Sequence, residues 1–546
     1  MTPYIRRLLP ASLVLLVRLC GALLLVLPSL APSALRAAEQ SPESQGSSLI
    51  VRTTKGLVKG IETNGVRAFL GIPYAAPPVG ALRWRPPQEV APWQGVRQAD
   101  RFANHCPQNA PGVFGAPSTT EDCLYLNVFA LRHGQGASAA EHRPVMVWFP
   151  GGGLFSGESE DYDGSKLAKD GDTVVVTLNY RIGALGFFSH PSLSTEGHPV
   201  SNYGIMDEQA ALRWVHDNIR SFGGDPGNVT IFGQSAGATG VLANLVSPAS
   251  AGLFHRAINQ SGTRFTPVPQ DTAVSEAEDF AKAAGCPDQS AACLRSLSVE
   301  QVLANQSALI NTQKGSFPVI DGTILTGDPL ALIAQGRFNR VPVMNGLVAD
   351  EQGFFLPEAT GGPVLTASGY TAFLASFGAQ NVSALEAKYP LANYASPSLA
   401  DIAAAQGQKV CVARALDSRL SSHVPTYTYQ FNDETAPSYL PPLSYPTRAF
   451  HTAELQYLFP LFRGGQGTPH PLNEPQTRLS DAMVRIWTHF ARTGSPTAGA
   501  TFGPEAWPRY DTARDNVQVL DIHDIRTAYH YGVQYDCALW DPILGY

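Results

Sequence analysis

The chain has 546 residues, of which 44% are hydrophobic and 15% are charged, and its formal net charge is −7. This apolar content excludes an intrinsically disordered protein, because such chains lack the material for a core. Apolar runs long enough to span a membrane occur only in the first forty residues, which excludes a polytopic membrane protein. Beyond that region there is no tract of Lys or Arg, so we expect no nucleic-acid partner. The length fits one large α/β enzyme.

The first residues have the features of an export signal. Arg6 and Arg7 precede an apolar stretch over residues 8–31, and small residues follow it. This order predicts a signal peptide over residues 1–38 and a protein that is secreted or periplasmic. An uncleaved anchor is the alternative, because about 20 apolar residues can cross a bilayer. After signal removal we expect no stable membrane span.

Six cysteines follow the signal segment. An even number of cysteines in an exported chain indicates disulfide bonds, with buried free thiols as the alternative. Six cysteines allow about 15 pairings. Proximity in the sequence favours the first with the second and the third with the fourth, which leaves the last two for each other. In chain order they are Cys106, Cys123, Cys286, Cys293, Cys411 and Cys537.

Strand-like and helix-like segments alternate along residues 39–546. Two segments have helical character, and residues 209–219 place Ala211, Leu212, Val215 and Ile219 on one face. The other helical segment is 238–245, and the expected strands are 145–149, 173–178, 229–232, 341–344 and 426–431. Apolar strands separated by helices predict an α/β fold with a mostly parallel, twisted sheet covered by helices on both faces. We expect one domain over 39–546 with large loop and helix insertions.

The strongest functional motif is Gly-Gln-Ser-Ala-Gly, which contains Ser235. It directly follows the expected strand 229–232 and precedes the expected helix 238–245, as in a nucleophile elbow. The two glycines permit the tight turn, which projects the serine hydroxyl above the sheet. A serine hydroxyl is a weak nucleophile at neutral pH, so it requires a base and a group that orients the base.

A second glycine motif is expected to form part of an oxyanion hole. Gly151, Gly152 and Gly153 follow the expected strand 145–149. In hydrolases of this type, backbone N–H groups from such a loop act with the N–H of the residue after the nucleophile. The expected donors are therefore the N–H groups of Gly152, Gly153 and Ala236.

Together with motifs along the rest of the chain, these residues resemble the type-B carboxylesterase family, which includes the cholinesterases. The resemblance covers about residues 50–546 and implies the α/β-hydrolase fold and esterase chemistry. The motifs that carry it are residues 70–74, 82–84, 121–127, 151–153, 179–181, 202–204, 222–226, 260–262 and 318–322, the Cys286/Cys293 segment, and Cys537 followed by Trp540.

The resemblance also implies the partners of the nucleophile. The family's acid is a glutamate, here Glu351, with Asp350 as the alternative because Gln352 separates Glu351 from Gly353. The family's base matches His451. The order Ser235, Glu351, His451 is the order this fold requires. Ser261 matches a serine that supports the acid, and the family's disulfide pairing agrees with the pairing favoured by proximity.

The resemblance predicts a carboxylesterase that acts on small to medium esters as small-molecule substrates, with no metal and no organic cofactor. Phe114 is the only aromatic residue between Cys106 and Cys123, and Gln234 stands where cholinesterases carry glutamate. Both differences disfavour choline esters, because a cation–π site needs aromatic rings and a glutamine carries no negative charge to attract a cation. The alternatives are a hydrolase of a bulky ester (a long-chain lipid, a polyester or a multi-ester toxin) and a non-catalytic binding protein. The sequence gives no indication of oligomeric state.

Overall fold

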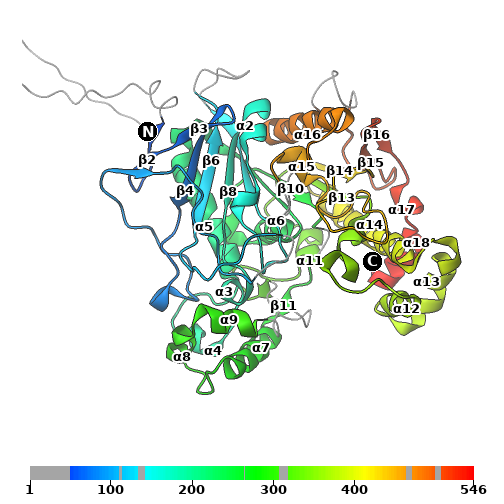
Figure 1. The fold of residues 1–546 in the computed structure, drawn as a ribbon, viewed down its shortest axis with the longest axis horizontal. Coiled ribbons are helices and arrows are strands. Elements are labelled where there is room, and N and C mark those ends of the chain that lie inside the picture. The colour runs from blue at the N-terminus through cyan, green and yellow to red at the C-terminus, as the bar shows by residue number, and fades with distance from the viewer. Residues whose placement is uncertain are drawn as a thin grey trace, which may run out of the picture. The chain divides into compact units, whose positions relative to one another are not determined.

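A large mixed β-sheet forms the centre of the computed structural model, which describes residues 49–109, 114–132, 142–262, 265–306, 318–462, 470–497 and 506–546 (Figure 1). The expected signal segment 1–38 lies outside the described residues. Within them the sheet has 11 strands, in the order β16 (Ile525–Ala528), β15 (Val517–Leu520), β14 (Thr426–Phe431), β13 (Val343–Val348), β10 (Arg256–Gln260), β9 (Gly224–Gln234), β7 (Arg143–Phe149), β8 (Val174–Leu178), β6 (Tyr125–Ala130), β4 (Val66–Pro73) and β3 (Ile61–Thr63).

The middle of this sheet is parallel and its edges are antiparallel. Strands β8, β7, β9, β10, β13, β14 and β15 pair in parallel. Strands β6, β4 and β3 extend one edge and β16 the other, all in antiparallel pairs. In parallel pairing, the carboxyl ends of the strands reach the same edge of the sheet, which is where such folds bind ligands.

Both faces of the sheet are buried. Along β7, Val145 and Val147 point into one core, whereas Met146 and Trp148 point into the other. Because successive side chains of a strand alternate between faces, a strand buried on both faces is apolar throughout. Helices α5 (Tyr203–Asn218) and α6 (Ala236–Val246) cover the first face, and α2 (Ser165–Gly171) and α16 (Glu474–Thr493) cover the second.

Two long insertions carry the other helices. Between β10 and β13 lie α7 (Gln270–Ala283), α8 (Ala291–Ser296), α9 (Val299–Asn305), α11 (Pro329–Ala334) and the small sheet of β11 (Val268–Pro269) and β12 (Val319–Ile320). Between β13 and β14 lie the short helix η5 (Glu351–Phe354), α12 (Ala367–Ala375), α13 (Val382–Lys388) and α14 (Pro397–Ser421). The remaining strands and α-helices of the described residues are β1 (Ile50–Arg52), β2 (Leu57–Lys59), β5 (Val96–Gln98), α3 (Gly183–Gly186), α4 (Pro191–Ser194), α15 (Leu455–Leu458), α17 (Tyr531–Gln534) and α18 (Cys537–Leu544).

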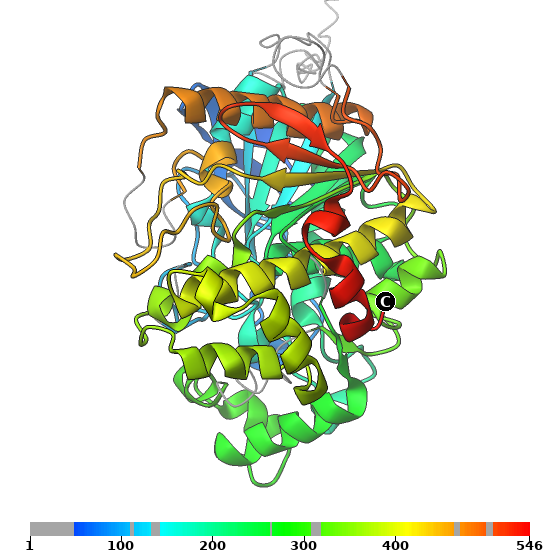
Figure 2. The ribbon, with the colours of Figure 1, turned by 90° about the vertical axis from the view of Figure 1, so that its right-hand side faces the viewer.

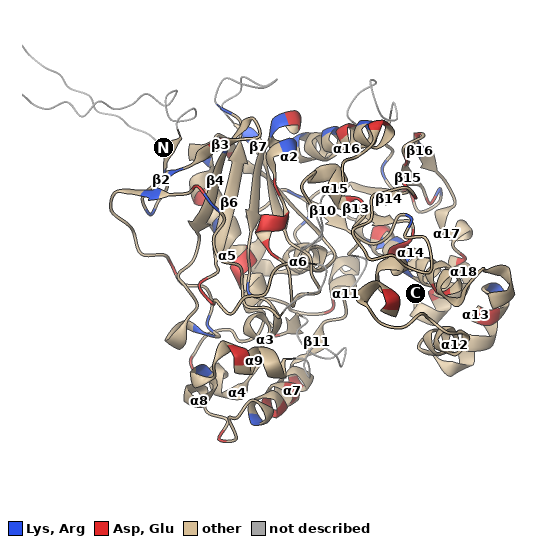
Figure 3. Ribbon diagram, viewed as in Figure 1, with Lys and Arg blue, Asp and Glu red and all other residues tan. Residues whose placement is uncertain are grey.

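Three disulfides connect the loops and helices: Cys106–Cys123, Cys286–Cys293 and Cys411–Cys537. The third joins α14 to α18 across 126 residues, and Figure 2 shows the red C-terminal helices lying against the yellow helix α14. Charged residues of both signs are interspersed over the described elements (Figure 3). Among the described residues, no helix combines the length and apolar character needed to cross a membrane.

The expected elements are present, but several boundaries differ. The expected strand 341–344 is β13, which continues to Val348 through the buried polar residue Asn345. Asn345 interrupts the apolar pattern, yet its amide donates to Asp417 at 2.7 Å. Helix α5 begins at Tyr203, six residues before the expected start at 209. Its first two turns are buried on all sides, so they show no single apolar face.

Candidate active site

Ser235 occupies the sharp turn between β9 and α6. Its backbone has φ 57° and ψ −122°, a conformation that is costly for a residue with a Cβ. Its N–H donates to the carbonyl of Gln260 on the neighbouring strand β10, at 2.9 Å. The turn lies at the carboxyl end of β9 and places Ser235 at the first position before α6. Here the backbone N–H groups of the first turn of α6 are available to an anion.

The glycines on either side of this turn are required by close packing. A Cβ on Gly237 would lie 2.7 Å from the carbonyl carbon of Phe149 and 3.0 Å from the carbonyl oxygen of Pro150. A Cβ on Gly233 would lie 2.5 Å from the backbone of Gly237. No real Cβ approaches backbone atoms so closely, so the chain closes this turn only with glycine at both positions.

The glycine loop after β7 lies against the turn. An added Cβ on Gly151 would lie 3.4 Å from Ser235 Cβ. Gly152 and Gly153 have φ of 120° and 65°, and Ser156 fixes the loop by donating from N–H and Oγ to the Gly152 carbonyl at 2.9 and 3.0 Å. Within the described part of the chain, the N–H groups of Gly152, Gly153 and Ala236 have no hydrogen-bond acceptor. They are donors that a developing oxyanion could use.

His451 contacts Glu351 directly. Its Nδ1 forms a short hydrogen bond with Glu351 Oε2, and both side chains are buried. A backbone hydrogen bond from Asp350 to Ala449, 2.9 Å long, brings the two loops together. Burial by itself would raise the pKa of Glu351. The charge and hydrogen bond of His451 and the charge of Lys409 outweigh burial and hold this pKa below its ordinary value.

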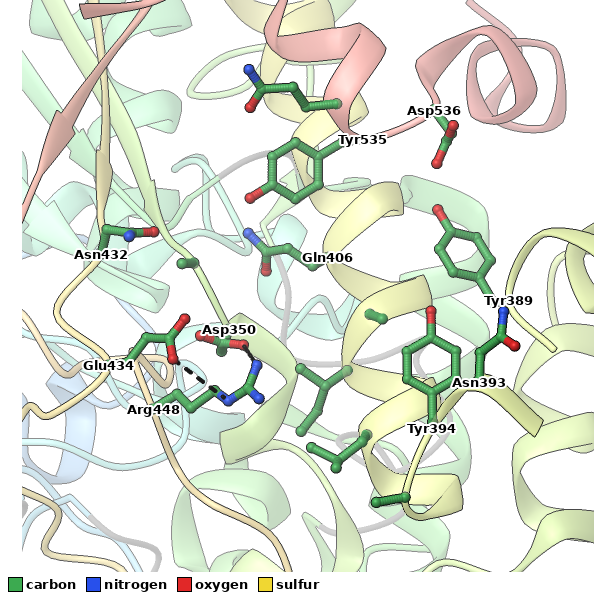
Figure 4. Close-up of a pocket in the computed structure, with 16 residues that line it drawn as sticks. Asp350, Tyr389, Asn393, Tyr394, Gln406, Asn432, Glu434, Arg448, Tyr535 and Asp536 are labelled. Atoms are coloured by element: carbon green, nitrogen blue, oxygen red, sulfur yellow. Dashed lines mark ion pairs between the residues drawn. The ribbon is translucent and has the colours of Figure 1, made fainter. Parts of the chain in front are cut away.

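Asp350, the alternative acid, points elsewhere. Figure 4 shows its carboxylate facing Arg448, which also approaches Glu434. The two ion pairs measure 3.7 and 3.9 Å. These residues line a cavity of about 540 Å³ next to the loop that follows β13 and carries Asp350 and Glu351, which we call the acid loop. Burial raises the pKa of Asp350 to about 6. The residue that contacts the imidazole is therefore Glu351.

Helix α14 holds the acid loop in place. Gln406 accepts a hydrogen bond from the Glu351 N–H at 3.1 Å and donates to the Val348 carbonyl at 2.9 Å. The N–H of Val348 in turn donates to Glu351 Oε1 at 3.2 Å. The buried Ser261 hydroxyl lies near the carboxylate and lowers its pKa, although it forms no hydrogen bond of ordinary length with any described residue.

The other imidazole nitrogen faces Gln234. The Gln234 side-chain nitrogen lies 3.1 Å from His451 Nε2, and the amide is fully buried. The Ser235 hydroxyl has no hydrogen bond to His451 among the described residues. Such bonds are often long in an unliganded enzyme and shorten when substrate binds. The structure therefore brings His451, Glu351 and Gln234 into contact, beside the turn that carries Ser235.

Aromatic rings border the imidazole. The rings of Phe354 and Phe355 lie 5.6 and 4.7 Å from the His451 ring, centre to centre. Phe355 keeps 46% of its surface exposed. Phe114, the aromatic residue of the first disulfide loop, is buried against Phe354. No local motif in the sequence marks Phe354, Phe355, Gln406 or Lys409 as residues of the site.

Glu454 is a second buried carboxyl group near Glu351. Burial, together with the charge of Glu351, raises the pKa of Glu454 to about 8. The Gln260 amide donates to this carboxyl group at 3.4 Å, and the Trp487 indole N–H donates to the Gln260 side-chain oxygen at 3.0 Å. Glu454 is therefore mostly protonated at neutral pH.

This protonation predicts a stability that depends on pH. Unfolded Glu454 titrates near 4.5, so the folded protein holds a proton that the unfolded chain has lost. The stabilisation is complete below pH 4.5 and is lost as pH rises through about 8. In Glu454→Gln this loss is absent. We expect the free energy of unfolding of the variant, relative to wild type, to rise by about 1.4 kcal/mol per pH unit in that range. Urea unfolding at pH 5.5, 7 and 8.5 checks this, and a difference independent of pH would contradict it.

Comparisons with known proteins identify the family of this chain. The family model of the carboxylesterase family matches residues 47–540. The chain belongs to the carboxylesterase family. An acylcarnitine hydrolase of Mus musculus is 36% identical over 509 residues, covering 88% of this chain and 86% of that protein. A para-nitrobenzyl esterase of Bacillus subtilis (strain 168) is 33% identical over 498 residues, covering 86% and 94%. A solved structure of PNB esterase superposes with a TM-score of 0.76 at 32% identity and covers 90% of this chain and 99% of that one.

Membership in the carboxylesterase family confirms the fold predicted from the sequence, an α/β-hydrolase fold with a mostly parallel sheet between helices. The protein is accordingly an ester hydrolase.

Proposed function

We propose that this carboxylesterase uses Ser235 as nucleophile, His451 as general base and Glu351 as the acid that orients the base. The observation that carries the proposal is the buried contact between His451 Nδ1 and Glu351 beside the strained turn of Ser235. With Nδ1–H bonded to the carboxylate, Nε2 is the basic nitrogen and can take the serine proton. Ser261, whose hydroxyl lies near the Glu351 carboxylate, helps to keep this acid ionised.

The proposed reaction has two steps. Ser235 Oγ attacks the ester carbonyl while His451 takes its proton, and the oxyanion receives hydrogen bonds from Gly152, Gly153 and Ala236. The C–O bond to the alcohol breaks as His451 returns the proton to the leaving oxygen, which leaves an acyl-enzyme. Water then adds to the acyl carbonyl while His451 takes its proton, and His451 returns that proton to Ser235 Oγ as the acyl C–O bond breaks and the free acid departs. Water supplies the protons and His451 transfers them, so the proposed cycle requires no cofactor.

We propose small to medium carboxylic esters as substrates. Phe114 is the aromatic residue of the first disulfide loop and is buried, so it offers no exposed face to a cation. Gln234 is uncharged where a carboxylate would attract one. The relatives are named for different esters, which supports a general carboxylesterase. The three disulfides and the N-terminal segment support export to a secreted or periplasmic location.

The proposal is tested by labelling and by an ester series. A phosphonate that reacts with activated serines is incubated with the protein, and the adduct is located by peptide mass spectrometry. We expect the adduct on Ser235 and an initial burst of nitrophenol from short 4-nitrophenyl esters. Turnover restricted to long acyl chains would instead identify a bulky-ester hydrolase. Absence of both label and turnover in folded protein would leave a binding protein and overturn the proposal.

Gln234 gives a separate prediction about pH dependence. In Gln234→Glu, a carboxylate replaces the amide 3.1 Å from His451 Nε2 and favours the protonated imidazole. We expect the acid limb of the kcat/KM profile to move to higher pH by about one unit. The exposed Gln335→Glu adds the same charge on the surface and serves as control. A profile that is the same in both variants would show that Gln234 does not act on the base.

A further inference from the structure

Lys409 is a cation beside the proposed catalytic residues, and the mechanism above does not use it. It lies on α14, two residues before Cys411, and its side chain is partly exposed. Its ammonium lies over the ring of Phe355, with Nζ 4.4 Å from the ring centre. Within the described residues, the ammonium has neither a hydrogen bond nor an ion pair within 4.0 Å. A partly buried charge without a close counter-ion is costly, and a bound anion would offset that cost.

Phe355 connects this ammonium to the base. The centre of its ring lies 4.7 Å from that of the His451 ring, and the ring is 46% exposed. Phe355 is thus an exposed ring in contact with the imidazole, and Lys409 lies over the same ring. If a substrate whose carbonyl lies at Ser235 extends past Phe355, a negative group on either side of its ester bond can reach Lys409.

The two carboxylates near Lys409, those of Glu351 and Asp401, leave its ammonium partly available to bind an anion. Glu351 is bonded to His451, and the side chain of Gln352 lies against Asp401. Burial raises the pKa of Asp401 to about 6, so this group competes weakly in acid and more strongly above pH 6. Burial lowers the pKa of Lys409, and the charges of Glu351 and Asp401 oppose that fall.

We propose that Lys409 binds a free carboxylate on the substrate, so that this esterase prefers esters bearing a carboxylate to neutral esters of the same size. The proposal rests on the proposed function, because it places the substrate at Ser235. Lys409 acts as a specificity residue: it does not touch the reacting atoms but pairs with a remote group of the substrate. An ammonium–carboxylate contact in a partly buried site would change kcat/KM by about 10-fold or more.

The test compares matched pairs of esters. In the acyl arm, mono-4-nitrophenyl adipate is compared with its methyl ester by release of nitrophenol. In the alcohol arm, 4-acetoxybenzoate is compared with its methyl ester by release of acetate. The ratio of kcat/KM for the anionic and the neutral ester is measured in wild type, Lys409→Met and Lys409→Arg. We expect the ratio to fall about 10-fold in Lys409→Met in at least one arm and to recover in large part in Lys409→Arg.

Two further variants keep the test decisive. Lys282→Met removes an exposed lysine of α7 and controls for the change in net charge. Asp401→Asn removes the competing carboxylate and should raise the ratio above wild type, which provides a readout if Lys409→Met folds poorly. A ratio unchanged in Lys409→Met and Asp401→Asn, even if both esters become slower together, would overturn the proposal and leave Lys409 acting only on Glu351. Failure of the proposed function would instead appear as loss of all turnover and of the Ser235 label.

Discussion

Glu351→Gln is expected to lower kcat for ester hydrolysis by about 10⁴-fold, the size of effect that the corresponding Asp→Asn change has in a Ser-His-Asp protease. The amide keeps the shape of the side chain but loses the charge that stabilises the imidazolium. It can also turn its NH₂ toward Nδ1, which places the imidazole proton on Nε2, where it blocks uptake of the serine proton. The measurement is kcat on a short 4-nitrophenyl ester, with thermal unfolding to show that the variant is folded.

Asp350→Asn is the matched control, because it makes the same chemical change at the adjacent residue. Asp350 faces Arg448 in the cavity of Figure 4 and does not contact His451. We expect its kcat to remain within a few-fold of wild type. Equal losses in the two variants would show that the effect comes from damage to the loop, and a larger loss in Asp350→Asn would identify Asp350 as the acid.

Gly237→Ala is expected to abolish activity and to lower the thermal stability of the fold. The added methyl would lie 2.7 Å from the carbonyl carbon of Phe149, so either β7 or the turn at Ser235 must move. Movement of β7 would displace the glycine loop that follows it and holds Gly152 and Gly153. Movement of the turn would displace the nucleophile Ser235. Overpacking of this kind costs about 1–3 kcal/mol or more. Soluble yield, thermal unfolding and esterase activity measure the effect.

Gly327→Ala is the control for this substitution. A Cβ at Gly327 would lie 3.5 Å from the Leu332 side chain, which is an ordinary contact, and the backbone there needs no left-handed conformation. We expect yield and activity near wild type. If Gly237→Ala behaved in the same way, the close packing of the turn against β7 would be wrong.

The sequence predicted what local patterns encode. The strand that ends at Gln234 contains the strand-forming run Val-Thr-Ile-Phe at residues 229–232, followed by Gly-x-Ser-x-Gly, so strand, turn and helix are all recognisable within about twenty residues. The glycine loop after β7 is readable for the same reason. The predicted strand was shorter than β13 because the buried Asn345 forms its hydrogen bonds with Asn259 and Asp417, which lie 86 and 72 residues away in the sequence.

The surroundings of the acid could not be predicted in this way. Gln406 and Lys409 lie more than fifty residues beyond Glu351, on a helix that is buried on several sides and shows no single apolar face. Neither residue belongs to a recognisable spacing pattern. Gln406 forms hydrogen bonds with the acid loop, and Lys409 lies over the Phe355 ring. Their roles depend on how α14 packs against η5, which is a property of the folded structure alone.

The disulfide between Cys411 and Cys537 links the order of biosynthesis to the proposed chemistry. Cys411 lies on the same helix as Gln406, which holds the acid loop, and its partner is made 126 residues later. Closing so long a loop stabilises the folded state by roughly 4–5 kcal/mol in the chain-entropy account. The helix that supports Glu351 is therefore secured only after the C-terminal segment has been synthesised and has met an oxidant. A chain that meets no oxidant lacks this link between α14 and the C-terminal segment, so we expect the surroundings of Glu351 to be less stable in a reducing medium.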